Sequence, residues 1–443
     1  MMTLASYNHL ALLMSFGWLC IIGASYSWIL LLFLRHRRAG LAEESRLLGR
    51  ELPADSELPH VLIQVPVRNE GELVCRIATA IAELDWPTDR LHVQILDDSD
   101  DGSLASSEEA LGALRRRNVD ATVLHRRNRN GFKAGALAAG LELSDHEFVA
   151  VFDADYVPPK DFLKSCMRPL LANPTIAFVQ ARADFLNAKE SLVTRIQQRL
   201  LDAHYVIEQA ARSWSSHIMP FNGTCGVWRR AAIDEAGGWQ GDTLAEDLDL
   251  SYRAQLLGWR PFFLTTVVVS GELPASLRTW LPQQFRWRKG SAEVARKILP
   301  LLVSSHLGFS RKLMSGLHLC GALLGPMAGV ILVSGTIDLT FGMGMTFGTA
   351  LLAMMFALEL MAAQSLVLLS QHLVRRANIF TEVIKLQLIL CALGYVHFAN
   401  SRANLEAWLG YGTDFVRTPK RRRSIAIRAP EPRPAPLLAP IHE

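Results

Sequence analysis

The chain opens on a long run of apolar residues, roughly Leu10 to Leu34, that contains no charged side chain. This length is about what an α-helix needs to cross a bilayer, and it exceeds the apolar core of a signal peptide. The basic run Arg-His-Arg-Arg follows at positions 35–38. Because positive residues flank membrane spans on the cytoplasmic side, we predict a transmembrane helix over residues 1–34 and a cytoplasmic location for the region that follows.

Beyond the first apolar run, the pattern changes to short alternating elements. Residues 35–59 are polar and charged and include two prolines, which predicts a cytoplasmic linker. From residue 60 to 295, β-rich runs alternate with helical stretches such as Leu73 to Leu84 and Phe132 to Leu143. This alternation predicts βαβ units and a mostly parallel sheet, and therefore an α/β domain. The predicted strands are Val61 to Val67, Leu91 to Leu96, Phe148 to Phe152 and Ile176 to Gln180.

The C-terminal third is again apolar. Two runs, about Leu313 to Val333 and about Met345 to Leu373, are long enough to span a bilayer. A third run, Ile379 to Ala399, contains polar side chains that are costly in lipid, and basic residues follow it as well as precede it. We therefore predict that it lies in the interface or re-enters, which leaves three full spans in the whole chain. The remaining predicted segments are an interfacial amphipathic segment at 296–312, a basic segment at 401–427 and a disordered Pro-rich tail at 428–443.

Composition narrows the classes of function. Half of the residues are hydrophobic, as expected of a soluble domain joined to membrane segments. A formal net charge of +4 is too small to indicate a nucleic-acid partner, and the basic residues gather beside apolar stretches instead. The 6 cysteines form no C-x-x-C pair, which disfavours a disulfide framework and a thiolate zinc site, so we expect them to be reduced.

Acidic pairs directly follow two of the predicted strands. Asp97 and Asp98 follow the second strand, and Asp153 and Asp155 follow the third. Ligands of open α/β sheets bind outside the carboxyl ends of the strands, so both pairs are expected to face one crevice. The carboxylates of Asp153 and Asp155 suit a single Mg²⁺ or Mn²⁺ ion, for which a diphosphate can supply further oxygen ligands. A solvated turn is the alternative for this pair.

Two segments near the crevice suit a nucleotide. Asp97 and Asp98 are able to accept hydrogen bonds from ribose hydroxyls or a base edge, although Asp and Ser also favour helix N-caps. Lys133 lies between two glycines in NRNGFKAGAL, at the start of a predicted helix. A lysine beside a helix N-terminus suits a phosphate, although the Walker spacing is absent.

A further acidic segment, AEDLD, supplies a candidate base. It contains Glu246 and Asp247 in an otherwise apolar helical stretch. In an inverting displacement, a carboxylate accepts the proton of the attacking hydroxyl while the leaving group departs from the opposite face. Asp247 is the candidate for this role, and a solvent-facing acidic turn is the alternative.

Two more motifs suit a polyhydroxylated substrate. The sequence QQFRW places Gln283, Arg286 and Trp287 within about one and a half helical turns. The indole is able to stack on a sugar face while the other two side chains bind a diphosphate or hydroxyl groups, although interfacial helices also use Trp and Arg. The sequence FNGTCG is either a structural turn or a loop that brings backbone amides to an acceptor; its central residues are Asn222, Gly223 and Thr224.

The order and spacing of these motifs resemble family 2 glycosyltransferases of the cellulose, hyaluronan and mannan synthase group. Within that group, the chain is most similar to plant-type cellulose-synthase-like mannan and glucomannan synthases and their bacterial relatives. The resemblance runs from about Val61 to Trp287 and rests on VPVRNE, LDWPTDR, NRNGFKAGAL, VFDADYVP, FVQAR, FNGTCGVWR, and ELP followed by QQFRW. It implies a GT-A domain, a Rossmann-like mixed sheet that binds nucleotide-diphospho-sugars, together with transmembrane helices.

The resemblance also implies a role for each motif. Asp155 with Asp153 would hold the metal, and Asp247 with Glu246 would supply the base. The residues implied at the nucleotide are Pro66, Arg68, Glu70, Asp97, Asp98 and Lys133, and those implied at the acceptor end and diphosphate are Asn222, Gly223, Thr224, Gln283, Arg286 and Trp287. Phe415, Thr418 and Lys420 resemble the F-x-V-T-x-K gating loop of the synthases, with Arg417 in place of the usual valine.

The expected function follows from this resemblance. It implies a multi-pass inverting β-glycosyltransferase of the cell (inner or plasma) membrane, with a cytoplasmic catalytic domain. The expected donor is a nucleotide-sugar of the UDP-glucose or GDP-mannose type, and the expected product a β-linked glucan or (gluco)mannan. The alternative is a lipid glycosyltransferase that makes a monoglycosylated diacylglycerol or ceramide, and a third reading is a degenerate member that acts as a scaffold. Expected partners are the donor, the acceptor, membrane lipid and export or accessory subunits, but no nucleic acid.

Overall fold

The computed structural model describes residues 4–341 and 347–412, and its soluble part is built on one mixed sheet. Seven strands lie in the order β3-β2-β1-β4-β6-β5-β7. All neighbouring strands are parallel except around β6, which is antiparallel to both β4 and β5. The predicted mostly parallel α/β sheet is confirmed. The strands are β1 (Val61–Val67), β2 (Leu91–Asp97), β3 (Asp120–His125), β4 (Phe148–Val151), β5 (Ile176–Phe185), β6 (Gly226–Arg229) and β7 (Arg260–Gly271).

The central strands are apolar on both faces because helices cover both sides of the sheet. In β1, Val61, Ile63 and Val65 pack in one core, and the intervening Leu62 belongs to the core on the other face. Strands buried on both faces have near-continuous apolar runs, which is why these segments were recognisable in the sequence. The helices of the first core are α2 (Leu73–Ala82), α3 (Leu104–Arg116) and α5 (Phe162–Ala172), and the second core includes α4 (Phe132–Glu142).

The helices after β5 surround the other end of the sheet. α6 (Leu192–Asp202) runs through a π-helical turn (Ala203–Gln209) into α7 (Ala210–Trp214). α8 (Arg230–Glu235) and α9 (Glu246–Leu256) follow β6. The remaining α-helices are α1 (Leu4–Leu48), α10 (Leu277–Ser304), α11 (Phe309–Cys320), α12 (Leu324–Phe341), α13 (Phe347–Arg375), α14 (Ile379–Ala399) and α15 (Ser401–Leu409).

Two of these helices continue past segment boundaries that were predicted from the sequence. α1 continues to Leu48, so much of the predicted 35–59 linker is helix, because no proline interrupts the pattern before Pro53. Its end is fixed to the sheet by buried Glu44, which accepts hydrogen bonds from the Thr265 hydroxyl at 2.6 Å and the Thr266 amide at 2.9 Å. α10 likewise runs through the boundary at residue 296, so 296–304 continues the helix that carries QQFRW.

The membrane helices differ from the predicted spans. Among the described residues, two helices are long and apolar enough to cross a membrane, Ala5–Leu48 and Ile379–Leu409. A bent pair, Phe309–Cys320 and Gly325–Phe341, meets the same criteria together, with an angle of 67° between its helices. Thus the predicted interfacial segment at Ile379 to Ala399 has the length and composition of a span, whereas the run at Leu313 to Val333 is broken.

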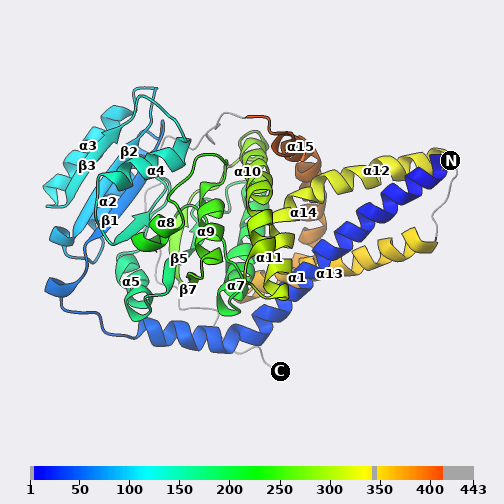
Figure 1. Ribbon diagram of the computed structural model, residues 1–443, viewed down its shortest axis with the longest axis horizontal. Helices are drawn as coiled ribbons and strands as arrows, with labels where there is room; N and C mark the ends of the chain where they lie inside the picture. Colours follow the sequence, from blue (N-terminus) through cyan, green and yellow to red (C-terminus); the bar gives the residue numbers. More distant parts are fainter. Residues whose placement is uncertain (1–3, 342–346, 413–443) are drawn as a thin grey trace.

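The polar side chains of α14 explain why its sequence looked unsuited to lipid. Glu382 lies near the start of the helix and pairs with Arg199 of α6 at 2.7 Å and with Lys385 at 2.6 Å. These charges are therefore neutralised where the helix meets the soluble domain. Figure 1 shows α1, α12 and α13 extending together away from the sheet, and both α12 and α13 contact α1. The gating-loop candidates Phe415, Thr418 and Lys420 and the tail lie outside the described residues.

Candidate active site

Four of the segments singled out in the sequence meet at the carboxyl end of β4. The Lys133 ammonium lies 2.7 Å from Asp153 Oδ1 and 3.8 Å from Glu246 Oε1. It also donates a hydrogen bond of 2.9 Å to the carbonyl of Gly223. Burial opposes the charged form of Lys133, but the Asp153 and Glu246 carboxylates outweigh it and raise the pKa of this lysine. The structure thus brings together the NRNGFKAGAL, DAD, AEDLD and FNGTCG segments.

The loop before α4 allows Lys133 to reach this position. Gly131 adopts a left-handed conformation with φ of +71°. A Cβ atom on Gly135 would lie 2.0 Å from the carbonyl oxygen of Asn130, so the helix can fold back on its own loop only with glycine at this position. The two glycines that flank Lys133 therefore have a structural function, which is to aim its side chain at the strand end.

Asp247 is the most perturbed carboxylate of the group. It lies in the first turn of α9, and burial followed by repulsion from Glu246 raises its pKa from 3.8 to about 7, with Lys133 acting in the opposite direction. Gly223 has φ of +75°, and a Cβ atom there would lie 2.8 Å from Asp247 Oδ2. The FNGTCG loop therefore lies directly against this carboxylate. A buried carboxyl with a pKa near neutrality is suited to exchange a proton with a substrate.

The Asp153 and Asp155 pair is held by hydrogen bonds to its backbone. The Asp153 amide donates to the Thr224 hydroxyl at 2.9 Å, and the Asp155 carbonyl accepts from Arg76 Nη2 at 2.9 Å. Arg76 in turn forms a buried ion pair with Glu272, in the ELP segment after β7. Sequence reasoning did not assign roles to Arg76 or Glu272, although the ELP motif indicated the position of the latter.

The donor set fits a hard divalent cation that is only partly ligated by protein. Within the described part of the chain, no group of three or more His, Cys, Asp or Glu side chains gathers as a metal site. A metal ion held by the two carboxylates of Asp153 and Asp155 would take its remaining ligands from a diphosphate and water, as magnesium and manganese do. Lys133 lies on the same side of Asp153 and is able to bind an anionic group beside such an ion.

Two of the predicted nucleotide residues, Asp97 and Asp98, are buried and already have partners within the protein. Asp97 is fully buried, with its carboxylate accepting from the Ser99 amide at 2.7 Å and from the Ser107 hydroxyl. Asp98 forms a two-point ion pair with Arg126, at 2.8 and 2.6 Å. Neither contact of Asp97 is the predicted helix N-cap, because the N-cap position of α3 is Ser103. Arg126, which the sequence did not single out, is the partner of Asp98.

The VPVRNE segment borders the same strand ends. Pro66 pairs with Leu96 in the sheet, and Arg68 extends to Asp100 at 3.1 Å. Asn69 adopts φ of +55°, and its backbone N–H donates a hydrogen bond of 2.8 Å to the Ser99 hydroxyl. These contacts join the loop that contains Glu70 to the loop after β2, at the carboxyl ends of β1 and β2.

The QQFRW residues extend along one helix, α10, beside the carboxylates. Burial lowers the pKa of Arg286, while the charges of Glu246, Asp153 and Asp247 act in the opposite direction. The guanidinium of Arg286 is therefore near these three carboxylates. Gln283 is half-buried, and Trp287 is 43% exposed, so its indole is accessible to a ligand. α10 is brought close to α9 by Gly290, where a Cβ atom would lie 2.8 Å from that of Ala245.

A second layer of polar residues, which the sequence did not indicate, lies behind the FNGTCG loop. His204 on the π-helical turn lies 3.1 Å from Asn222 Oδ1 and 3.0 Å from Glu208 Oε2. Glu208 also pairs with Arg212 at 2.9 Å. Because His204 and Asn222 are 18 residues apart and belong to different elements, no spacing rule connects them.

The comparisons with known proteins agree with this site. Residues 59–290, just over half of the chain, match the model of a family described as glycosyltransferase like family 2. The chain belongs to this glycosyltransferase family. The match covers the sheet and the acidic segments and reaches the end of QQFRW in α10, so it coincides with the region in which the sequence motifs were found.

Curated relatives of this family 2 glycosyltransferase include several plant enzymes. It is 42% identical over 273 residues to glucomannan 4-beta-mannosyltransferase 1 from Cyamopsis tetragonoloba, covering 59% of this chain and 52% of the relative. It is 43% identical over 252 residues to glucomannan 4-beta-mannosyltransferase 2 from Arabidopsis thaliana, covering 56% of this chain and 47% of the relative. The chain thus spans about half the length of the curated relatives that it matches.

A solved structure supports the fold of the glycosyltransferase domain. The mannosyltransferase PcManGT from Pyrobaculum calidifontis, solved in complex with GDP-Man and Mn²⁺, aligns with a TM-score of 0.54 at 20% identity. The alignment covers 87% of this chain and 100% of that one. It confirms the GT-A type of fold predicted from the sequence motifs.

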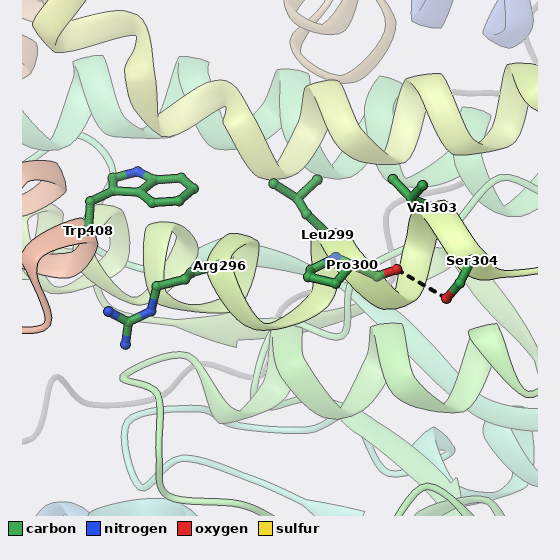
Figure 2. Close-up of a pocket in the computed structure, with 6 residues that line it drawn as sticks. All are labelled: Arg296, Leu299, Pro300, Val303, Ser304 and Trp408. Carbon is green, nitrogen blue, oxygen red and sulfur yellow. Dashed lines mark hydrogen bonds between the residues drawn. The ribbon is translucent and has the colours of Figure 1, made fainter.

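The family 2 glycosyltransferase also carries an apolar groove away from the carboxylates. Figure 2 shows it between α10 and Trp408 of α15, with a volume of about 430 Å³. Its lining contains no carboxylate, so it does not belong to the acidic cluster. The residues that line it are Arg296, Leu299, Pro300, Val303, Ser304 and Trp408.

Proposed function

We propose that this protein is a membrane-bound inverting β-glycosyltransferase that transfers a hexose from a nucleotide-sugar to a growing β-linked polysaccharide. The observation that carries the proposal is the half-buried carboxyl of Asp247, whose pKa is raised to about 7 and which lies beside the Gly223 backbone and near Lys133, the partner of Asp153. GDP-mannose is the first donor to test because glucomannan 4-beta-mannosyltransferases are among the relatives, and UDP-glucose is the second.

The proposed reaction is a single displacement at the anomeric carbon. A hydroxyl oxygen of the acceptor attacks this carbon, the bond to the diphosphate breaks, and the nucleoside diphosphate leaves from the opposite face. The proton of the attacking hydroxyl passes to Asp247, whose neighbour Glu246 helps to keep the pKa of this base high enough to accept it. One displacement inverts the configuration, so an α-linked donor gives a β-linked product.

The cationic side chains have complementary roles in this proposal. Lys133 holds Asp153 in place and stabilises the anionic diphosphate, and Arg286 of α10 approaches the same region from the other side. A magnesium or manganese ion on Asp153 and Asp155 would neutralise charge on the leaving diphosphate. Trp287 is exposed and offers its ring to the face of an acceptor sugar.

The proposal also places the catalytic domain in the cytoplasm. The basic run at residues 35–38 follows the apolar part of α1, and Glu44 in the same helix joins it to β7. A second membrane-side helix is also joined to the domain, because Arg375 at the end of α13 pairs with Asp184 at 2.6 Å and Asp202 at 3.1 Å. A polymer made beside these helices is formed close to the membrane, where export or accessory subunits would receive it.

A second candidate is transfer to a membrane lipid, such as diacylglycerol or ceramide. The apolar groove between α10 and Trp408 favours it, because α10 also carries the QQFRW residues. The test is to measure nucleotide release from purified protein with a panel of nucleotide-sugars and Mg²⁺ or Mn²⁺, followed by linkage analysis. A water-insoluble or precipitable β-linked polymer supports the first candidate, a product that extracts into organic solvent supports the second, and absence of nucleotide release contradicts both.

A further inference from the structure

The carboxyl end of β7 holds the loop that follows Asp155. Val157 and Ser270 form an antiparallel bridge, with backbone hydrogen bonds of 2.7 Å and 3.2 Å. Gly271 lies against the ring of Tyr156, because a Cβ atom on this glycine would lie 2.5 Å from Tyr156 Cε1. The two residues directly after Asp155 are therefore fixed to β7.

Arg76 of α2 fastens the backbone of Asp155 itself. Its Nη2 donates a hydrogen bond of 2.9 Å to the Asp155 carbonyl, and its Nη1 donates to the carboxylate of Glu272, directly after β7. The side chains of Arg76 and Glu272 are each only 4% exposed. A guanidinium is a rigid planar fork, so Glu272 fixes the fork and the fork fixes the peptide group of Asp155.

The carboxylates of Asp153 and Asp155 differ in their surroundings. The Asp153 side chain is 34% exposed and is held by Lys133 at 2.7 Å. Asp155 is only 2% exposed. Because a buried carboxylate is stable when it is paired or coordinates a metal, Asp155 suits the inner ligand of a cation and Asp153 the outer one. The direction in which the inner side chain points depends on its backbone, since the backbone selects the allowed rotamers.

We propose that Arg76, held by Glu272, is a positioning residue that sets the affinity of this protein for Mg²⁺ or Mn²⁺ by fixing the backbone of Asp155. The inference rests on the proposed function, in which Asp153 and Asp155 carry the cation. Arg76 does not touch the ligand itself, because its side chain is buried and both of its terminal nitrogens contact protein. It acts through the loop, as the outer residues of metal sites commonly do.

The test is a titration of full-length protein in detergent with Mn²⁺, in which the electron paramagnetic resonance signal reports the free ion. The nucleoside diphosphate that the wild type releases in the donor panel is present throughout. Arg76→Lys keeps a positive charge beside Glu272, but a single ammonium cannot reproduce the two-point fork. We expect the Kd for Mn²⁺ to rise about 10- to 100-fold. The Kd for the same nucleotide, measured in EDTA, should be unchanged.

A second variant tests the same link from the partner of Arg76. Glu272→Gln keeps the size of the side chain and an acceptor oxygen for Nη1, but it removes the charge that holds the guanidinium in place. The Kd for Mn²⁺ should therefore rise in this variant as well, by a smaller factor than in Arg76→Lys.

The matched control is Arg229→Lys. Arg229 on β6 has the same arrangement, since its guanidinium binds the carboxylate of Glu147 at 2.8 Å and the carbonyl of Leu170 at 2.7 Å. It pairs with Phe148 at the amino end of β4, whereas Asp153 follows the carboxyl end. This variant should lose thermal stability as Arg76→Lys does, but bind Mn²⁺ as the wild type does.

The inference is overturned if neither Arg76→Lys nor Glu272→Gln weakens the binding of Mn²⁺, or if Arg229→Lys weakens it equally. It is also overturned if Arg76→Lys loses the nucleotide equally with and without the cation, or if the wild type transfers sugar without binding Mn²⁺ or Mg²⁺. A wild type that releases no nucleotide from any nucleotide-sugar would refute the proposed function itself, which separates the two failures.

Discussion

Asp247 is half-buried in a position where ionisation is costly, and the surrounding residues do not offset this cost fully. Lys133 lowers its pKa, but burial and Glu246 have the larger effect, and Lys133 is itself engaged by Asp153 at 2.7 Å. A carboxylate with a low pKa is a weak base. A carboxyl group with a pKa far above the working pH stays protonated and cannot accept a further proton. A pKa near 7 lies between these limits.

Replacing this carboxyl tests the proposed base. Asp247→Asn keeps the size of the side chain and removes its ability to accept a proton, so we expect the transfer rate to fall by about 10²- to 10⁴-fold. In the wild type, kcat/KM should rise as the pH increases through about 7, because only the ionised form of Asp247 is active. Near-normal turnover by the variant would contradict the assignment.

Asp247→Asn should lower activity but raise the stability of the folded protein. The pKa of Asp247 is higher in the folded protein than its ordinary value of 3.8, so folding is penalised once the pH rises above that value and fully above about 7. Asn carries no such penalty. The Tm of Asp247→Asn should therefore match that of the wild type near pH 4 and exceed it increasingly up to pH 7 to 8, as measured by thermal unfolding in detergent.

Gly223 offers a test of the contact between the FNGTCG loop and the base. Gly223→Ala adds a methyl group 2.8 Å from Asp247 Oδ2, and a displacement of this kind should reduce activity roughly 100-fold. Gly238→Ala is the matched control, because Gly238 has a similar φ of +73° but no neighbour within 4 Å of its Cβ position. Equal activities of the two variants would show that backbone strain alone matters.

At this scale the sequence indicated the residues that we propose for the reaction, but not the residues that hold them in place. Asp153, Lys133 and Asp247 lie in short motifs at strand ends or helix starts, which are readable from local pattern. Their supports are distant in the chain: Arg126 reaches Asp98 across 28 residues, and His204 reaches Asn222 across 18. Such pairs depend on how the elements pack, and a single sequence carries no signal for them.

At the scale of elements, predictions succeeded where burial is complete. β1 was predicted with its observed ends because nearly every side chain is buried. β6 has only four residues and contacts β4 and β5 in the antiparallel sense, so it has neither the length nor the alternation of a recognisable strand. α14 has the length and composition of a span, whereas the sequence predicted an interfacial segment, because the cost of its charges was counted without the ion pair between Arg199 and Glu382.

A buried ion pair between two elements should be a main support of the loop that contains Asp153 and Asp155. Glu272, after β7, pairs with Arg76 of α2, which also binds the backbone carbonyl of Asp155. Glu272→Ala leaves a buried charge unpaired, so we expect a loss of about 3–5 kcal/mol in the free energy of unfolding. The control is Glu83→Ala, which removes the exposed pair with Lys160 and should cost only about 0–1 kcal/mol. Similar losses in the two variants would contradict this account.

At the scale of the whole molecule, the membrane helices are joined to the sheet by polar contacts. Glu44 ties α1 to β7, and Arg375 ties α13 to the segment between β5 and the π-helical turn. Figure 1 shows the far ends of α1 and α12 at the opposite end of the molecule from the sheet. The catalytic domain and those far ends should therefore lie on opposite sides of the bilayer.

Cysteine labelling in sealed vesicles tests this orientation. A cysteine in place of exposed Ser56 should react with an impermeant thiol reagent only when the cytoplasmic face is accessible. A cysteine in place of Leu339, which is 87% exposed near the far end of α12, should react only from the other side. Labelling of both positions from one side would contradict the proposed topology.

The most direct test of the central claim is to supply purified protein with radiolabelled GDP-mannose, a divalent cation and a β-linked oligosaccharide acceptor, and to digest the product with linkage-specific β-glycanases. The account predicts a labelled polymer that a β-mannanase degrades, formed by the wild type and absent with Asp247→Asn. A product that resists every β-glycanase, or equal synthesis by both proteins, would contradict inverting transfer with Asp247 as the base.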